Sequence, residues 1–487
     1  MSTSDASSGP EAVRSRPEPI AEAPPGPMPD GFAEALARLR EELSPDELHL
    51  PGAPAAAPYA GDVRSRAATG TVFAVAAPRT VPAVQTVLRI AHAHRVSVIP
   101  RGAGTGLSGG AVPDHGSIVL TLEHLDRIRE IDVLDEVAVV EAGVITGDLD
   151  AHLMPLGFFY APDPASAAIS SIGGNIATNA GGLHCAKYGV TRESVLGLEV
   201  VLADGTLLCT GHRSIKGVTG LDLTQLIIGS EGTLAVVVAA TLRIRPRPPA
   251  RRTVLARFPD AAAAGRGVNA ISRSPVRPAA TELMTAPTLR VVDAAHGSEL
   301  ARGDSAVLLL ELDGYGVPEQ TADLVAVLEA EGAHVHRPDD AEAEMLWALR
   351  RAGRGRGEGT WRIGEDVAVP ASRLAEMLEQ VEEIGRGRGV EATVLAHAGD
   401  GNLHPAFALP IPDGADPDRV PQVLHEAADD LIRAALALGG TISGEHGIGR
   451  AKLTWLDLEL PPASRQPQSR IKAAFDPCGI LNPGKAI

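Results

Sequence analysis

The chain contains little cysteine. Only Cys185, Cys209 and Cys478 occur among its 487 residues. A scattered set of odd number indicates neither a disulfide framework nor a cysteine-rich zinc or iron–sulfur site. We therefore expect a protein from a reducing compartment that has no iron–sulfur relay of its own.

The chain also lacks a basic excess and long apolar runs. It carries 44 Lys and Arg against 61 Asp and Glu, a net charge of −17, which argues against nucleic acid as the main partner. No apolar stretch reaches the roughly 20 residues that span a bilayer, and the N-terminal segment has no apolar core of a signal peptide. We expect a cytoplasmic protein without a transmembrane segment, and we leave peripheral membrane association open.

The length suits two or three domains. We predict a disordered tail over 1–29, a helical segment over 30–58, an α+β domain over 59–247, a second α+β domain over 248–440, and a C-terminal segment over 441–487. The stiff, proline-rich stretch at 245–249 marks the boundary between the two domains. The glycine–arginine stretch at 353–359 favours a flexible loop or lid over nucleic-acid contact.

Hydrophobic periodicity predicts the elements of both domains. In the first we expect an open sheet, with helices at 31–43 (capped by Asp30) and 81–94 and strands at 96–99, 117–122, 137–141, 196–202 and 234–244. In the second we expect one antiparallel sheet covered on one face, with strands at 252–258, 306–312, 334–337 and 367–369 and helices at 261–272, 319–331, 341–351 and 372–385. A further helix is expected near 469–475.

A loop with five glycines follows the strand expected at 96–99, in the sequence PRGAGTGLSGGA at 100–111. Its backbone N–H groups can converge on one anion, for which a pyrophosphate is suited. Gly104 to Gly109 also matches the G-x-G-x-x-G pattern of NAD-binding sheets, but that pattern must open a helix, and Pro113 and Gly116 break any helix here. We therefore expect phosphate binding by backbone donors and Arg101, the alternative being a glycine-rich loop without a ligand.

Two further segments are rich in small residues. One runs from Asp163 to Gly182 and the other from Ile228 to Thr233. Glycines with hydroxyl and amide donors are expected where backbone lines a flat ring and a ribityl chain, although small-residue loops also occur for packing alone.

Two histidines flank a turn signal in His397-Ala-Gly-Asp-Gly-Asn-Leu-His404. Asp400-Gly401 predicts a two-residue type I′ hairpin, which would place His397 directly opposite His404, with Cβ atoms about 4.5–5.5 Å apart. Both imidazoles could then reach one divalent ion, with Glu445 as the third ligand and open positions for substrate. Such a set fits Zn, Mn or Fe. The alternative is that these are exposed loop histidines.

Six motifs in this order resemble one known family. They are PRGAGTGLSGGA (100–111), IGGNIATNAGG (172–182), IGSEGTL (228–234), HAGDGNLHP (397–405), SGEHGIGR (443–450) and AAFDPCGILNPGK (473–485). Over 59–487 the chain resembles FAD-dependent enzymes of the vanillyl-alcohol oxidase (PCMH-type) fold, specifically the glycolate oxidase flavin subunit and the D-lactate and D-2-hydroxyglutarate dehydrogenases.

The resemblance implies a two-subdomain PCMH-type FAD-binding domain, an α+β cap domain with an antiparallel sheet, and a C-terminal helical segment. It also implies oxidation of a 2-hydroxy acid to the 2-oxo acid. Because the glycine-rich loop has no His or Cys, we expect non-covalent FAD. The FAD-binding residues that the resemblance implies are Arg101, Gly102, Ala103, Gly104, Thr105, Gly106, Gly109, Gly110, Pro162, Asp163, Ser166, Gly173, Gly174, Asn175, Thr178, Asn179, Gly181, Gly182, Glu231, Gly232 and Asn482.

By the same resemblance His397, His404 and Glu445 are metal ligands and His446 is the base. A metal that binds the substrate carboxylate and hydroxyl lowers the hydroxyl pKa, while an imidazole takes the proton and a hydride leaves to flavin N5. Arg350 matches an arginine that binds the substrate carboxylate, the alternative being that it solvates a helix end.

The chain departs from the hydroxyglutarate branch at two positions, where Ala406 replaces an asparagine and Gly364 replaces a lysine. We therefore expect a substrate with one carboxylate, such as D-lactate or glycolate. The alternatives are a metal-free oxidase of another alcohol and a non-catalytic flavin subunit of a redox complex. The sequence does not identify the electron acceptor, for which the candidates are an iron–sulfur partner subunit, a quinone, a cytochrome and a diffusible protein. It also does not decide whether the protein forms a homodimer.

Overall fold

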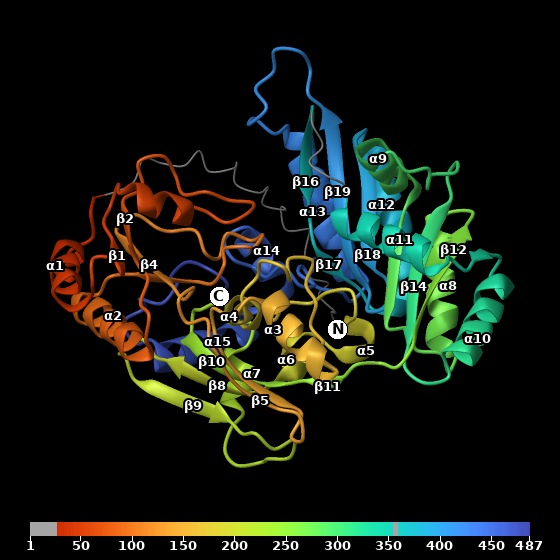
Figure 1. Ribbon diagram of the computed structural model, residues 1–487. Helices are drawn as coiled ribbons and strands as arrows, with labels where there is room; N and C mark the ends of the chain where they lie inside the picture. Colours follow the sequence, from red (N-terminus) through yellow and green to blue (C-terminus); the bar gives the residue numbers. More distant parts are fainter. Residues whose placement is uncertain (1–26, 354–358) are drawn as a thin grey trace, which may run out of the picture.

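The computed structural model describes residues 27–353 and 359–487. Most of the predicted tail and the centre of the glycine–arginine stretch therefore lie outside the described residues. The fold is α+β, as predicted, and its two halves lie side by side in Figure 1, one built from the first half of the chain and the other from the second. We call them the flavin half and the cap half, after the resemblance above.

The first sheet of the flavin half has the order β1-β2-β4-β3, formed by β1 (Leu48–His49), β2 (Phe73–Ala76), β4 (Ser117–Thr121) and β3 (Val98–Arg101). Helices α1 (Phe32–Glu42) and α2 (Val81–His94) belong to it, and α2 has the predicted bounds. The predicted cap at Asp30 is wrong, because Gly31 holds the N-cap position of α1 and no side chain caps it.

The second sheet is antiparallel and has the order β5-β6-β10-β8-β9. Its strands are β5 (Ile128–Asp132), β6 (Val137–Glu141), β10 (Val236–Arg243), β8 (Val195–Val201) and β9 (Leu207–Gly211). The predicted single open sheet is therefore wrong. The strands fall into two sheets that share one apolar core, and periodicity within a strand does not say which strand it pairs with.

Short elements connect these sheets. They are η1 (Pro54–Tyr59), α3 (Thr146–Leu153), η2 (Met154–Leu156), β7 (Phe158–Phe159), α4 (Ile172–Thr178), α5 (Cys185–Tyr188), α6 (Thr191–Ser194), α7 (Leu223–Ile227) and β11 (Arg245–Pro246). Helix α4 contributes Ile172 and Ile176 to the shared core, which fixes the small-residue segment that surrounds it.

The cap half contains one antiparallel sheet, as predicted, with the order β15-β12-β14-β13-β18-β19-β16. Its strands are β15 (His334–His336), β12 (Arg251–Phe258), β14 (Ala306–Asp313), β13 (Ala280–Met284), β18 (Glu391–His397), β19 (Asn402–Pro410) and β16 (Thr360–Gly364), and β17 (Val367–Ala368) also pairs with β19.

Helices cover both faces of this sheet, so the prediction of one covered face is wrong. One core contains apolar side chains from α8 (Ala261–Arg273), α10 (Val317–Ala330), α12 (Leu374–Arg388) and α13 (Gln422–Ala437). A second core on the other face contains side chains from α9 (Ala286–His296) and α11 (Asp340–Ala352). Every residue of β14 is buried, which is typical of a strand covered on both faces.

The C-terminal segment returns to the flavin half after α14 (Leu453–Glu459) and α15 (Pro462–Phe475). Val98 N–H donates to Ile480 O and Asn482 N–H donates to Val98 O, both at 2.8 Å, so this segment extends the edge of the first sheet. On the way, residues 443–449, which we call the Glu-His loop, pass between the two halves. No helix in the described part of the chain is long and apolar enough to cross a membrane.

Candidate active site

His397 and His404 share one face of the cap sheet, but the predicted hairpin register is wrong. The loop Ala398–Gly401 connects β18 to β19, His397 pairs with Asn402, and His404 stands opposite Leu395. Gly401 has a positive φ of 81° and Asp400 does not, so the turn is not type I′. Because side chains alternate along a strand, a shift of two residues keeps both histidines on the same face, with ring centroids 5.1 Å apart.

The carboxylate of Glu445 lies close to both histidines, so the three predicted ligands converge, and their binding of a metal stays a prediction. Glu445 Oε1 lies 3.4 Å from His397 Nε2 and 3.2 Å from His404 Nε2. A tetrahedral ion about 2.0–2.1 Å from each ligand atom would hold those atoms about 3.3–3.4 Å apart. The three side chains therefore fit a divalent metal.

Glu282 on β13 supports this set and was not predicted. Its fully buried carboxylate lies 2.8 Å from His397 Nδ1, an arrangement that leaves Nε2 for a metal. Burial disfavours a charged His397 ring, but Glu282 and Glu445 outweigh it and raise the pKa of His397. Burial likewise opposes a charged Glu445, but His397 and His404 outweigh it and lower the pKa of that carboxyl.

The structure excludes one of the two surroundings considered for Arg350. Arg350 is buried on α11, so it does not solvate a helix end, and it is not among the residues that line the cavity described below. Instead its guanidinium forms an ion pair with Glu282. A direct contact of Arg350 with substrate therefore stays a prediction without support from this geometry.

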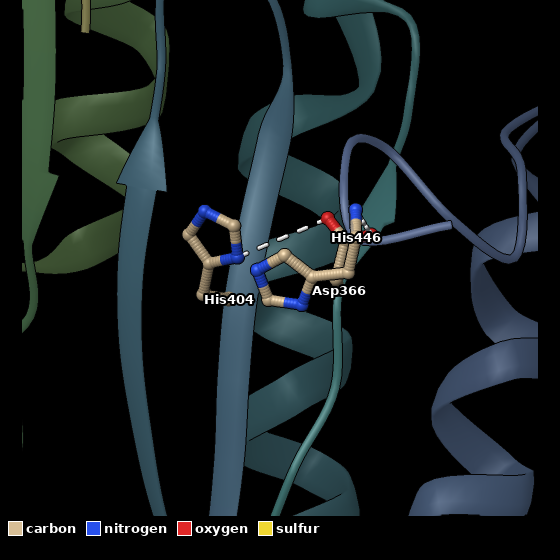
Figure 2. Close-up of side chains that lie close together, drawn as sticks. All are labelled: Asp366, His404 and His446. Carbon is tan, nitrogen blue, oxygen red and sulfur yellow. Dashed lines mark hydrogen bonds and ion pairs between the residues drawn. The ribbon is translucent and has the colours of Figure 1, made fainter. Parts of the chain in front are cut away.

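Asp366 is the central residue that sequence reasoning missed. It follows β16, is fully buried, and its Oδ2 accepts hydrogen bonds from Glu445 N–H (3.1 Å), His446 N–H (3.0 Å) and Ser443 Oγ (2.8 Å). Figure 2 shows it beside the rings of His404 and His446. Burial would raise the pKa of Asp366, but nearby positive charge, including that of Lys452, outweighs it and lowers that pKa, so the carboxylate is charged. Its only sequence signal was an acidic pair, Glu365-Asp366, directly before a predicted strand.

His446 is one of the residues that line a cavity, and its ring stacks on that of His404. The two ring centroids are 5.0 Å apart and the planes differ by 14°. Burial lowers the pKa of His446, with Asp366 opposing the effect, so the ring is neutral near pH 7. A neutral buried imidazole can accept a proton from a bound molecule.

The cavity beside His446 has a volume of about 480 Å³, within the range of ligand sites. Glu445 and His446 form part of its wall. It is lined by these predicted FAD-binding residues: Arg101, Gly102, Ala103, Gly104, Thr105, Gly106, Gly110, Ser166, Gly173, Gly174, Asn175, Thr178, Gly181, Glu231 and Gly232. Its wall also contains apolar residues that sequence reasoning did not single out, including Val63, Ile169 and Val237.

The other predicted residues lie outside the lining of this cavity, namely Gly109, Pro162, Asp163, Asn179, Gly182 and Asn482. Asn482 supports the wall from behind, because its Nδ2 donates to Gly110 O (3.1 Å) and Glu231 O (2.7 Å). Asp163 lies 2.7 Å from His184 Nδ1.

The Arg101 side chain packs against the glycine-rich loop and supports it. Its Nη1 donates to Gly61 O at 2.7 Å, and its guanidinium lies so close to Gly104 that a Cβ there would come within 2.0 Å of Nη2. The Arg101 guanidinium is therefore directed at the protein backbone, and the predicted contact with a phosphate is not seen. The backbone N–H groups of the loop are the donors that fit an anion. A cavity walled by glycine loops of this kind fits a dinucleotide such as FAD.

Known proteins resemble this chain over most of its length. The family description "FAD binding domain" matches residues 73–211, and "FAD linked oxidases, C-terminal domain" matches residues 247–486. The glycolate oxidase subunit GlcD of Bacillus subtilis is 40% identical over 85% of this chain and 88% of its own. The D-lactate dehydrogenase of Archaeoglobus fulgidus is 35% identical over 85% of this chain and 91% of its own.

Among solved structures, p-cresol methylhydroxylase with bound substrate superposes with a TM-score of 0.75 at 18% identity, over 95% of this chain and 98% of its own. This likeness confirms the predicted PCMH-type fold. The two family matches and the relatives at 35–40% identity show that the chain belongs to the FAD-linked oxidase family. It is therefore an FAD-linked oxidoreductase.

Proposed function

We propose that the protein is an FAD-dependent dehydrogenase that oxidises a 2-hydroxy acid, of the D-lactate or glycolate type, to the 2-oxo acid. The observation that carries the proposal is the position of two neighbouring residues. Glu445 completes the ligand set of His397 and His404, while His446 stands in the wall of the flavin cavity. The relatives named glycolate oxidase subunit and D-lactate dehydrogenase support the same substrate class.

The chain supplies the ligands, the base and their positioning. When bound, FAD supplies a two-electron acceptor and a divalent ion supplies a Lewis acid for the substrate hydroxyl and carboxylate. His397, His404 and Glu445 would hold the ion, and a ring nitrogen of His446 would take the hydroxyl proton. Asp366 fixes the His446 backbone and, 3.8 Å from His404 Nδ1, also stabilises positive charge that arises in this group.

Small residues next to the ligands favour a small substrate. Gly364 on β16 pairs with Ala406 on β19, and Ala406 lies on the same face as His404, two residues away. Neither residue offers a polar group to a second carboxylate. We therefore propose a substrate with one carboxylate, bound by the metal. Electrons would then pass to an acceptor outside the chain, for which a partner subunit, a quinone, a cytochrome or a diffusible protein are the candidates.

Anaerobic flavin reduction tests this function. The purified FAD-loaded protein is mixed without oxygen with D-lactate, glycolate, L-lactate or D-2-hydroxyglutarate, and the flavin absorbance is recorded. We expect bleaching by D-lactate or glycolate that requires the metal, and elemental analysis identifies the ion. Flavin that stays oxidised with every 2-hydroxy acid would reject the proposal. Full reduction by a metal-free preparation would instead support the metal-free oxidase.

A further inference from the structure

Two buried carboxylates hold the Glu-His loop by its backbone. Asp366, from the cap half, accepts the N–H groups of Glu445 and His446. Glu231, from the flavin half, accepts Ile448 N–H through Oε1 (2.8 Å) and Gly449 N–H through Oε2 (2.9 Å). Four backbone donors on both sides of Gly447 are therefore taken up by side chains that come from different halves of the molecule.

Glu231 lies between the glycine-rich loop and the Glu-His loop. Its side chain lines the cavity, and a Cβ on Gly110 of the glycine-rich loop would come within 3.2 Å of its Oε2. On the opposite side, a Cβ on Gly447 would come within 2.9 Å of its Oε1. A side chain on either glycine would therefore press against the Glu231 carboxylate.

The backbone of Glu231 is itself constrained. Its φ of 50° lies in the left-handed region, which costs a residue with a side chain about 1–2 kcal/mol relative to the right-handed one. Its N–H donates to Ala177 O at 2.8 Å and its O accepts from Asn482 Nδ2 at 2.7 Å. The backbone of Glu231 is thus fixed to residues around the flavin cavity, while its side chain contacts the Glu-His loop.

Further contacts join the glycine-rich loop to the Glu-His loop and to the two residues that follow it. Ser108 O, in the glycine-rich loop, accepts Arg450 N–H (2.8 Å) and Ala451 N–H (3.1 Å). Gly449 has a φ of 48°, and a Cβ there would lie 2.1 Å from Ser108 O, so the loops meet backbone to backbone. Gly181, also in the cavity wall, lies so close to Glu445 that a Cβ would come within 2.5 Å of its Oε2.

We propose that Glu231 is a positioning residue that couples the two sites, so that a flavin held in the cavity and a divalent cation held by His397, His404 and Glu445 strengthen each other's binding. The proposal rests on the function proposed above for these two sites. A flavin that orders the glycine-rich loop and Glu231 also orders the Glu-His loop, and the cation ligand Glu445 then needs no further ordering. Linkage requires the effect to be reciprocal.

Metal affinity in the absence and presence of FAD tests the coupling without turnover. Mn²⁺ and Zn²⁺ are titrated against a competing chelator into the deflavinated full-length chain and into the FAD-loaded chain. We expect about 5- to 150-fold tighter metal binding with FAD, the usual span of a coupling between two sites. The FAD dissociation constant, measured with and without metal, should change by the same factor.

Glu231→Gln identifies the residue that carries the coupling. The amide keeps the shape, but its NH₂ group faces one of the two backbone N–H donors that the carboxylate accepted. We expect the ratio of metal affinities with and without FAD to fall to within about twofold of one, even if FAD itself binds more weakly. Glu141→Gln is the matched control, because Glu141 is a buried carboxylate of the flavin half that pairs with Arg127 and Arg129. This control should keep the full ratio.

Equal metal affinity of the wild-type chain with and without FAD would overturn the coupling. This comparison tests the coupling even if the Glu231→Gln variant does not fold. A full ratio in folded Glu231→Gln would remove Glu231 from the role. The failure of the coupling differs from the failure of the proposed function. Metal that binds equally in both forms, together with normal flavin reduction, rejects only the coupling, whereas flavin that no hydroxy acid reduces rejects the function.

Discussion

The imidazole of His446 lies parallel to that of His404, with centroids 5.0 Å apart and planes within 14° of each other (Figure 2). The two rings nevertheless have different neighbours. His404 Nε2 faces Glu445 Oε1, whereas His446 is anchored through its backbone N–H to Asp366. The stack therefore places the proposed metal ligand against the proposed base, and variants of the two residues should fail in different ways.

Replacing His446 should remove the base and leave both binding sites. We expect His446→Ala to reduce the rate of anaerobic flavin reduction by about 10²- to 10⁴-fold, the usual contribution of general base catalysis. Metal content and FAD content should stay at wild-type levels. Rapid-mixing absorbance gives the rate and elemental analysis gives the metal. Wild-type reduction by this variant would show that His446 is not the base.

Replacing His404 should remove metal and activity together. His404→Ala takes away one of the three proposed ligands, so we expect the metal to be lost on dialysis and the rate to fall to that of chelator-treated wild type. His152→Ala is a suitable control, because His152 is exposed on α3, away from the ligand set. A His404→Ala protein that retains stoichiometric metal would contradict the assigned ligand.

Glu282 should tune metal affinity without touching the metal. It orients His397 through Nδ1, and changes of such supporting carboxylates typically weaken metal binding about 10- to 100-fold. We expect Glu282→Gln to weaken Mn²⁺ or Zn²⁺ binding by this factor in a chelator competition. The variant should also be less stable, because it leaves the buried Arg350 cation without its carboxylate. Unchanged metal affinity would reduce Glu282 to a partner of Arg350 alone.

His184 should make the contact between the two halves depend on pH. Its ring lies 2.7 Å from Asp163 Oδ2 in the flavin half and 3.3 Å from Glu311 Oε1 on β14. Burial opposes the charged ring, but the two carboxylates outweigh it and raise the pKa of His184 to about 10. Because the folded-state pKa is raised, the stabilisation is complete below the ordinary pKa of about 6.5 and is lost as the pH rises through about 10.

Thermal unfolding of His184→Gln measures this effect. The neutral amide keeps part of the hydrogen bonding, so the difference from wild type reports the charge. We expect the variant to be less stable by about 1.5–3 kcal/mol at pH 6, the value of hydrogen bonds to charged groups. The difference should shrink steadily toward pH 10. A difference that stays constant from pH 6 to pH 10 would exclude a protonated His184.

Local sequence signals located most of the elements but not their partners. The helix at Val81–His94 and the strand at Val137–Glu141 have the predicted bounds, because periodicity and capping are local properties. The two sheets of the flavin half and the helices on the second face of the cap sheet depend on long-range packing. The register of the β18–β19 hairpin also failed, since Asp400-Gly401 matched a tight turn that the longer loop does not form.

The motifs predicted the residues that form the candidate site but not the buried carboxylates that position them. His397, His404, Glu445 and His446 converge as expected because each lies in a distinctive glycine-rich pattern. Asp366 and Glu282 lie in ordinary strand-rich sequence, and a buried carboxylate becomes recognisable only when its neighbours are known. Arg350 shows the same limit, because its partner Glu282 lies on a strand that no local signal predicted.

The return of the C-terminal segment to β3 has a consequence for biosynthesis. Val98 is synthesised early and bonds to Ile480 and Asn482, which leave the ribosome late. Until then one edge of the first sheet has unpaired backbone groups, which can pair with other chains. We therefore expect nascent chains of this protein to need protection from aggregation by chaperones until translation is nearly complete.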